Sequence, residues 1–157
     1  MDIAARQIGA NVLATAHNLD DFIQTFFINI LSGDLKRIRW LNPLSESKSK
    51  YGIRKVKPFM EIYEMETTFF AYLKNLPFQS YTCPYMKESI RSEIRIMLNR
   101  LEATHPGLKY SIFNAAIGIA KGLSVKDGLK TLTCEICGYP SSNQKCAVCD
   151  ILSLLDK

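Results

Sequence analysis

Four cysteines near the end of the chain constrain its fold more than any other feature. They form two CxxC pairs, Cys134 with Cys137 and Cys146 with Cys149, and eight residues separate the pairs. This spacing is typical of four thiolates around one zinc ion, and Gly138 allows a tight backbone turn after the first pair. Four closed ligands leave no open coordination position, so we expect a structural zinc ribbon.

Two disulfides are the alternative to zinc at these cysteines. Disulfides would suit a secreted domain, but the N-terminus does not resemble a signal peptide. The chain has five cysteines, so pairing would leave one thiol over. The spacing therefore favours zinc.

The composition indicates one hydrophobic core and no membrane span. Of the 157 residues, 47% are hydrophobic, and no apolar run approaches the length of a transmembrane helix. We therefore expect a cytoplasmic protein.

Positive charge is concentrated between residues 36 and 57, where eight basic residues stand against the single acid Glu46. Such a stretch attracts phosphate, and a solvated loop that keeps the protein soluble is the alternative. Trp40 lies in this segment and could stack on an unpaired base, although core packing is the more common fate of tryptophan. The candidate RNA-binding residues are Arg37, Arg39, Arg54 and Lys55.

The order of elements predicts an incomplete α/β layer. The apolar run 11–15 lacks alternation, which is typical of a strand buried in a parallel sheet. Residues 20–31 predict a helix with acids in its first turn. The other predicted elements are a helix over 1–8, a strand over 53–59, and helices over 61–76, 87–103 and 108–123. The predicted parts are an α/β part over 1–60, a helical segment over 61–125 and the zinc ribbon over 131–152.

A polar group lies between the first strand and the next helix: His17, Asn18, Asp20 and Asp21. Ligands of open α/β sheets bind beyond the carboxyl ends of strands, where a helix N-terminus presents free amides to phosphate. Adjacent carboxylates there could hold magnesium. The alternative is an ordinary helix cap with a second acid that complements the dipole, and the residues alone favour that cap.

Six features occur in one order along the chain: residues 14–21, 29–34, 83–85, 88–95 and 105–107 and the four-cysteine ribbon. In this order they resemble the tRNA 2-thiolation enzymes of the PP-loop ATP pyrophosphatase superfamily. The resemblance covers nearly the whole chain, and the terminal CxxC pairs resemble the branch of archaeal, bacterial and eukaryotic cytoplasmic thiolation enzymes. It implies a partial adenine-nucleotide alpha hydrolase-like layer with parallel strands.

The resemblance implies ATP-dependent sulfur transfer to tRNA. ATP adenylates a uridine carbonyl oxygen, pyrophosphate leaves, and sulfur displaces the adenylate at carbon 2. The implied partners are tRNA and a sulfur-carrier protein, and a homodimer is compatible with the family.

The resemblance also assigns roles to individual residues. Asp20, Asp21 and Cys83 match catalytic positions. Cys83 matches one of three cysteines that hold a 4Fe–4S cluster; without the resemblance, a buried inert thiol is the simpler interpretation. The residues assigned to cofactor binding are His17, Asn18, Gly33, Asp34 and Cys83.

The chain also departs from the family. An N-terminal zinc ribbon, the phosphate loop Ser-Gly-Gly-x-Asp-Ser and a further cluster-binding CxxC are not found in the sequence. We therefore expect the chain to be a C-terminal portion, with Met1 inside a longer protein or at a truncated start, and we expect ATP, magnesium and the cluster only in the complete protein. Ala16, Phe22 and Ser32 replace a glycine, an acid and an arginine that are common in the family.

Two interpretations compete with an enzyme portion. One is a catalytically inactive, zinc-containing RNA-binding or scaffold module derived from the same family. The other is a zinc-stabilised protein-interaction domain.

Overall fold

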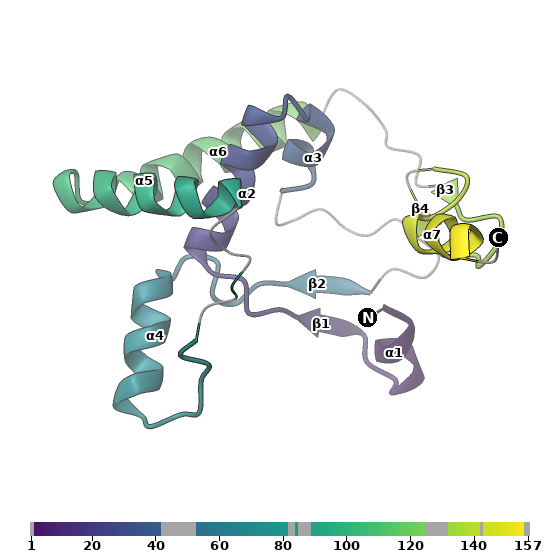
Figure 1. Cartoon of the computed structure of the whole chain (residues 1–157), viewed down its shortest axis with the longest axis horizontal. Coiled ribbons are helices and arrows are strands. Elements are labelled where there is room, and N and C mark those ends of the chain that lie inside the picture. The colour runs from purple at the N-terminus through teal and green to yellow at the C-terminus, as the bar shows by residue number, and fades with distance from the viewer. Residues whose placement is uncertain are drawn as a thin grey trace. The chain divides into compact units, whose positions relative to one another are not determined.

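The computed structural model describes residues 2–41, 53–81, 84, 89–124, 132–141 and 143–155. The chain forms two compact units (Figure 1). One comprises residues 14–45 and 57–126, and the other comprises residues 1–13, 46–56 and 127–157. The predicted three-part division at residues 60, 125 and 131 stays a prediction.

Two short strands form the α/β feature that the sequence predicts. Helix α1 (Asp2–Gln7) ends before Gly9, and strand β1 (Val12–Ala14) follows it. Strand β1 pairs with β2 (Arg54–Val56), and Figure 1 shows the two strands running in the same direction. The two predicted strands and their parallel arrangement are confirmed, over shorter lengths than expected.

A bundle of helices forms the core of the unit that contains residues 14–45 and 57–126. Helix α2 (Leu19–Leu31) packs against α3 (Leu35–Arg39), α5 (Ile90–Thr104) and α6 (Leu108–Ser124). At the centre of this bundle the rings of Phe22 and Phe113 meet edge to face, with centroids 4.9 Å apart. The fully buried large side chains are Leu19, Ile23, Ile38 and Leu98.

Helix α3 was not predicted, because its residues were assigned only to the basic segment. Gly33 has a φ of 65°, which favours glycine, and it ends the turn after α2. The Asp34 side chain then caps α3 by accepting the Arg37 N–H at 3.0 Å. The single apolar side chain that α3 buries is Ile38.

Helix α5 is amphipathic, and the apolar stripe that it buries is narrow. Ile94 and Leu98 are buried in the core, whereas Ile90, Met97 and Leu101 are exposed. The predicted helix is therefore confirmed, with a buried stripe of two residues.

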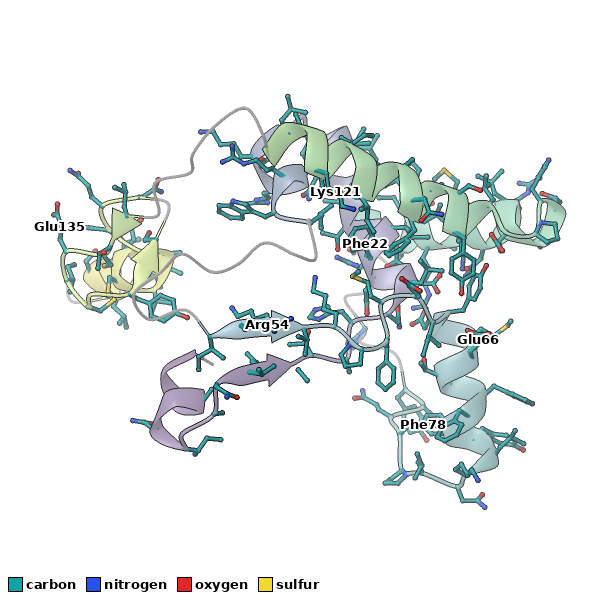
Figure 2. The ribbon with its side chains drawn as sticks, turned by 180° about the vertical axis from the view of Figure 1, so that it is seen from behind. Phe22, Arg54, Glu66, Phe78, Lys121 and Glu135 are labelled. Atoms are coloured by element: carbon teal, nitrogen blue, oxygen red, sulfur yellow. The ribbon has the colours of Figure 1, made fainter. Side chains whose placement is uncertain are left out.

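Helix α4 (Glu64–Leu73) is shorter than the predicted helix over 61–76, and it buries none of its residues. Figure 2 shows side chains projecting from several sides of this helix. The predicted helix is therefore present over a shorter length, and it contributes no buried residue to the core. Its large exposed apolar residues are Met65, Phe69, Phe70, Tyr72 and Leu73.

The four-cysteine region contains two very short strands and a helix. Strands β3 (Leu132–Thr133) and β4 (Pro140–Ser141) are antiparallel, with Leu132 opposite Ser141. Helix α7 (Ala147–Leu155) follows and was not predicted. Among the described helices, none combines the length and apolar character that a bilayer crossing requires.

The Glu102 side chain caps the start of α6. Its carboxylate accepts the N–H groups of Gly107 and Lys109, each at 2.7 Å, and the Tyr63 hydroxyl at 2.9 Å. Burial opposes ionisation of this group, but the two backbone hydrogen bonds prevail and hold the pKa of Glu102 below its usual value. Glu102 in its ionised form therefore stabilises the fold.

We expect Leu98→Ala to lower the free energy of unfolding by about 2–5 kcal/mol, because Leu98 is 1% exposed and its removal leaves a cavity. Met97→Ala is the matched control on the same helix, because Met97 is 41% exposed, and we expect a change within about 0.5 kcal/mol. Urea unfolding measures both values. Equal losses in the two variants would contradict this description of the core.

We expect Glu102→Gln to weaken the pH dependence of stability at acid pH. A carboxylate with a lowered folded-state pKa stabilises the protein above its unfolded value of about 4.3, and that stability is lost as pH falls through the folded value. Tyr63→Phe is the control, because it keeps both backbone hydrogen bonds to Glu102. Urea unfolding between neutral and acid pH measures the effect, and a wild-type pH profile in Glu102→Gln would contradict it.

Candidate functional site

The N-terminus of α2 is closed by a reciprocal cap. The Asn18 side chain accepts the Asp21 N–H at 2.9 Å, and the Asp21 carboxylate accepts the Asn18 N–H at 3.2 Å. This capping box satisfies two backbone donors that a helix N-terminus otherwise leaves free. The helix cap that the residues alone favour is therefore present.

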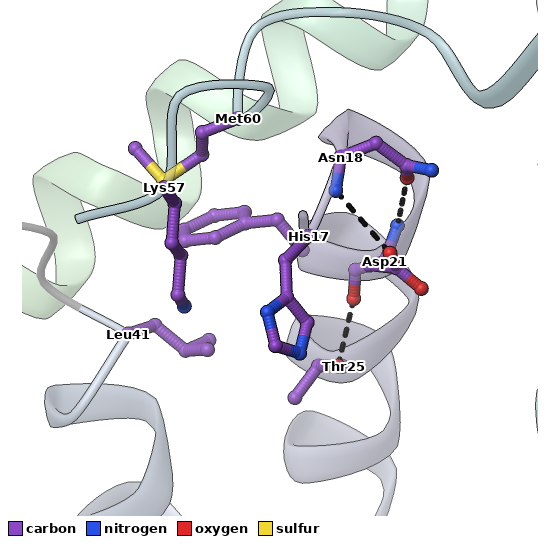
Figure 3. Close-up of a pocket in the computed structure, with 8 residues that line it drawn as sticks. His17, Asn18, Asp21, Thr25, Leu41, Lys57 and Met60 are labelled. Carbon is purple, nitrogen blue, oxygen red and sulfur yellow. Dashed lines mark hydrogen bonds between the residues drawn. The ribbon is translucent and has the colours of Figure 1, made fainter. Parts of the chain in front are cut away.

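A small open pocket lies beside this cap (Figure 3). Its volume is about 140 Å³. Polar groups come from the start of α2 and from the segment after β2, and Figure 3 shows Lys57 extending past Met60 toward Leu41, opposite His17. The lining residues are His17, Asn18, Asp21, Phe22, Thr25, Leu41, Lys57 and Met60.

Charge and size limit what this pocket can bind. Burial lowers the pKa of Lys57, and the negative charge of Asp21 acts in the opposite direction. The pocket thus contains the Lys57 amine, which can pair with an anion in its protonated form, and the Asp21 carboxylate, which can pair with a cation. Pockets for whole small molecules usually span about 300–1,000 Å³. This one is of a size for a phosphate group or a hydrated ion.

Lys57 is a site residue that the sequence analysis placed only in the basic segment. It directly follows β2, at the carboxyl end of a parallel strand, which is where ligands of α/β sheets bind. That position is the signal that could have identified it.

The structure separates the two adjacent carboxylates that were predicted together. Asp21 lines the pocket, whereas Asp20 is buried and does not line it. Asp20 forms an ion pair with Lys109 and accepts the Glu64 N–H at 2.8 Å. The two carboxylates therefore have different surroundings.

The other predicted cofactor residues are not brought to this pocket. Gly33 and Asp34 form the turn between α2 and α3. Cys83 lies outside the described residues. The pocket thus assembles His17, Asn18 and Asp21 from the predicted set.

The candidate RNA-binding residues lie on different elements. Arg37 is exposed on α3 and pairs with Asp34 at 3.3 Å, while Arg39 on the same helix is half-buried. Arg54 and Lys55 are exposed on β2. Trp40 is 53% exposed at the end of α3, so the expectation of core packing is wrong.

The four ribbon cysteines converge on one point. Their sulfur atoms all lie within 4.8 Å of one another. The Cys137 and Cys146 sulfurs are 3.7 Å apart, close to the edge of about 3.8 Å that a tetrahedron with Zn–S bonds of about 2.3 Å requires. All four are free thiols, so the disulfide alternative is wrong. The cluster is able to bind a metal ion.

Hydrogen bonds to sulfur give these thiols unequal acidity. Backbone N–H groups of Cys137 and Cys146 lower the pKa of Cys134 to about 6. Hydrogen bonds with the Cys137 and Cys146 sulfurs raise the pKa of Cys149 to about 12. Four sulfurs this close repel one another when they are ionised, so a cation among them is needed to stabilise the thiolates. The donor set therefore fits a divalent metal.

A three-cysteine cluster does not fit the cysteines of this chain alone. Of five cysteines, four belong to the ribbon, which leaves Cys83.

Comparison with known proteins places this geometry in a family. No family model matches the chain. It is 35% identical to a probable sulfurtransferase from Methanocaldococcus jannaschii, over 92% of the chain and 41% of that protein. It is 32% identical to cytoplasmic tRNA 2-thiolation protein 1 of Schizosaccharomyces pombe, over 100% of the chain and 47% of that protein. The chain is homologous to the tRNA 2-thiolation proteins.

A solved structure agrees with this assignment. The chain superimposes on U34-tRNA thiolase NcsA from Methanococcus maripaludis, determined with its [4Fe-4S] cluster, with a TM-score of 0.77 and 31% identity. The match covers 98% of this chain and 49% of NcsA. The predicted family is confirmed, and the chain spans about half the length of these tRNA 2-thiolation proteins.

We expect one metal ion per chain of this thiolation homologue, bound by the four ribbon thiols. Chelation should unfold residues 132–155 and leave α2, α5 and α6 intact, because the metal replaces a hydrophobic core in so small a region. Elemental analysis gives the stoichiometry, and amide NMR spectra report which residues unfold.

Two serine variants make the metal prediction specific. Cys137→Ser should lower the metal content, while Cys83→Ser, outside the ribbon, should leave it unchanged. A metal-free preparation with an intact ribbon would contradict the metal site.

Proposed function

We propose that the chain forms part of an ATP-dependent tRNA uridine 2-thiolation protein. The observation that carries this proposal is similarity over 92–100% of the chain to relatives described as a sulfurtransferase, a tRNA 2-thiolation protein and a tRNA thiolase. In this proposal β1, β2 and α2 belong to an adenine-nucleotide alpha hydrolase-like layer, the fold that binds ATP in this superfamily.

The pocket is the proposed edge of the nucleotide site. Lys57 offers a cation for a phosphate oxygen, and Asp21 offers a carboxylate for magnesium. His17 and Asn18 complete the polar wall. A pocket of about 140 Å³ does not enclose a whole nucleotide, so we propose that residues outside this chain hold the remainder.

The remaining catalytic and cofactor residues are proposed from the family resemblance. Cys83 would contribute one ligand to a 4Fe–4S cluster whose other ligands come from outside this chain. Gly33 and Asp34, at the turn between α2 and α3, would act in cofactor binding through the loop that they shape. When bound, the cluster would supply the iron position that handles sulfur.

Zinc is the metal that we propose for the ribbon. Four thiolate donors at tetrahedral separation suit zinc, and a site with four protein ligands holds structure without chemistry. The proposed role of the ribbon is therefore structural.

The proposed partners are tRNA and a sulfur-carrier protein, in the cytoplasm, with a homodimer as the proposed assembly. Support for tRNA comes from the exposed Trp40, which lies at the end of the basic helix α3 with Lys36 and Arg37. An exposed aromatic ring among cations offers an unpaired base a stacking surface and its phosphates a counter-charge. Arg39, Arg54 and Lys55 are the further proposed RNA contacts.

The decisive experiment joins the chain to the part of the Schizosaccharomyces pombe relative that it does not cover. We expect the joined protein to release pyrophosphate from ATP in the presence of tRNA. We expect the chain alone to release none and to show no 4Fe–4S absorption, because Cys83 is the single cysteine outside the ribbon. Pyrophosphate assays and absorption spectra measure both results.

A control variant separates activity from folding in the joined protein. Asp21→Asn should block pyrophosphate release while tRNA binding is kept. A folded joined protein that binds tRNA without turnover would instead support the inactive RNA-binding module.

RNA binding can be read from Trp40, because it is the one tryptophan of the chain. We expect tRNA to quench its fluorescence through base stacking. Lys36→Ala and Arg37→Ala should each weaken tRNA binding. Each should also reduce the slope of log K against log salt concentration by about one, because fewer counterions are released. Lys74→Ala is the control, because it removes one exposed charge outside the basic segment. Unquenched fluorescence at saturating tRNA would contradict the contact at Trp40.

A further inference from the structure

The carboxylate of Asp20 is buried, although its neighbour Asp21 lines the pocket. Asp20 is 2% exposed and pairs through one oxygen with Lys109 Nζ, a residue that is itself 6% exposed. The other carboxylate oxygen accepts the Glu64 N–H at 2.8 Å. Both oxygens of Asp20 are therefore engaged inside the protein.

The partner Lys109 is held from several sides. Its ammonium group donates to Asn99 Oδ1 at 2.6 Å and lies 5.5 Å from the centre of the Tyr63 ring. Its backbone N–H donates to Glu102 at 2.7 Å. Lys109 does not line the pocket, and its ammonium group donates to Asp20 and Asn99, so its charge serves Asp20.

These contacts connect four helices at the first turn of α2. Asp20 belongs to α2, Glu64 begins α4, Asn99 lies on α5 and Lys109 lies on α6. The same turn of α2 carries Asp21. A shift of this turn would therefore move the carboxylate that the pocket presents.

We infer that the two carboxylates have separate roles. Asp21 faces the ligand, and Asp20 is a positioning residue that, with Lys109, fixes the first turn of α2 and the direction of Asp21. This inference refines the proposed nucleotide site and rests on it for the role of Asp21. The role of the Asp20–Lys109 pair rests on the contacts alone.

The pair is tested by unfolding of the full chain. We expect Asp20→Asn and Lys109→Met each to lower the melting temperature, because each leaves the partner charge buried and unpaired. The double variant should recover most of the loss, because the introduced asparagine would keep an oxygen for the Glu64 N–H and neither charge remains. If the decreases in melting temperature of the two single variants add in the double variant, the positioning pair is overturned.

The pocket role is tested with Mn²⁺ as a paramagnetic probe of the two histidines, His17 in the pocket and His105 outside it. We expect Mn²⁺ to broaden the ring signals of His17 selectively in the wild type and in the double variant. Asp21→Asn should lose this broadening without a fall in melting temperature that matches Asp20→Asn. Asp20→Asn, measured while folded, should weaken it, and Lys109→Met in the double variant should restore it.

Two outcomes would separate the inference from the proposed function. The inference is overturned if Mn²⁺ broadens the His17 signals in Asp21→Asn but not in the folded double variant. Asp20 would then be the ligand. No selective broadening in the wild type would overturn the cation role of Asp21 and the proposed nucleotide edge. In that case a non-additive melting cycle would still support the Asp20–Lys109 pair.

Discussion

The buried ion pair of Asp20 and Lys109 is the constraint that links the first turn of α2 to α4, α5 and α6. Two charges without solvent are stable only with close partners, so the pair fixes the groups around it. Asn99 and the Glu64 N–H complete its hydrogen bonds. An apolar core tolerates small sliding of helices, whereas these directed contacts define one arrangement of α2, α4, α5 and α6.

The four-cysteine region uses a different source of stability. Its strands β3 and β4 have two residues each, too few to form a sheet with its own core. Convergence of four sulfurs within 4.8 Å supplies the organising contact, and the acidity of Cys134 shows that the backbone already favours a thiolate there. Directed packing thus organises one part of the chain, and a four-sulfur cluster that is able to bind a metal organises the other.

Local patterns predicted much of this fold. The apolar run before His17 and the acids at the start of α2 specified a strand and a helix, and the CxxC spacing specified the sulfur cluster. Helix α3 was missed, because five residues with one buried side chain carry no periodic pattern. The environment of Trp40 and the exposure of α4 also could not be predicted. They depend on which elements pack against them, and composition does not encode that.

The site shows the same division between local and long-range information. Asn18 and Asp21 form a cap that neighbouring residues dictate, so the sequence predicted it. The partner of Asp20 lies 89 residues further along the chain, and no local pattern connects the two. Lys57 and Met60 line the pocket together with the start of α2, and no local pattern connects these two segments either.

Helical geometry explains why the two adjacent acids Asp20 and Asp21 have different surroundings. Successive residues of an α-helix point about 100° apart, and here Asp20 is buried while Asp21 lines the pocket. One side of the turn faces the helical core, where a carboxylate must find a cation, and the next side faces the pocket. In a homologue that has both acids, each acid therefore has a role of its own. We expect an acid at position 20 to occur together with a basic residue at position 109. We expect an acid at position 21 to occur in homologues that bind the ligand.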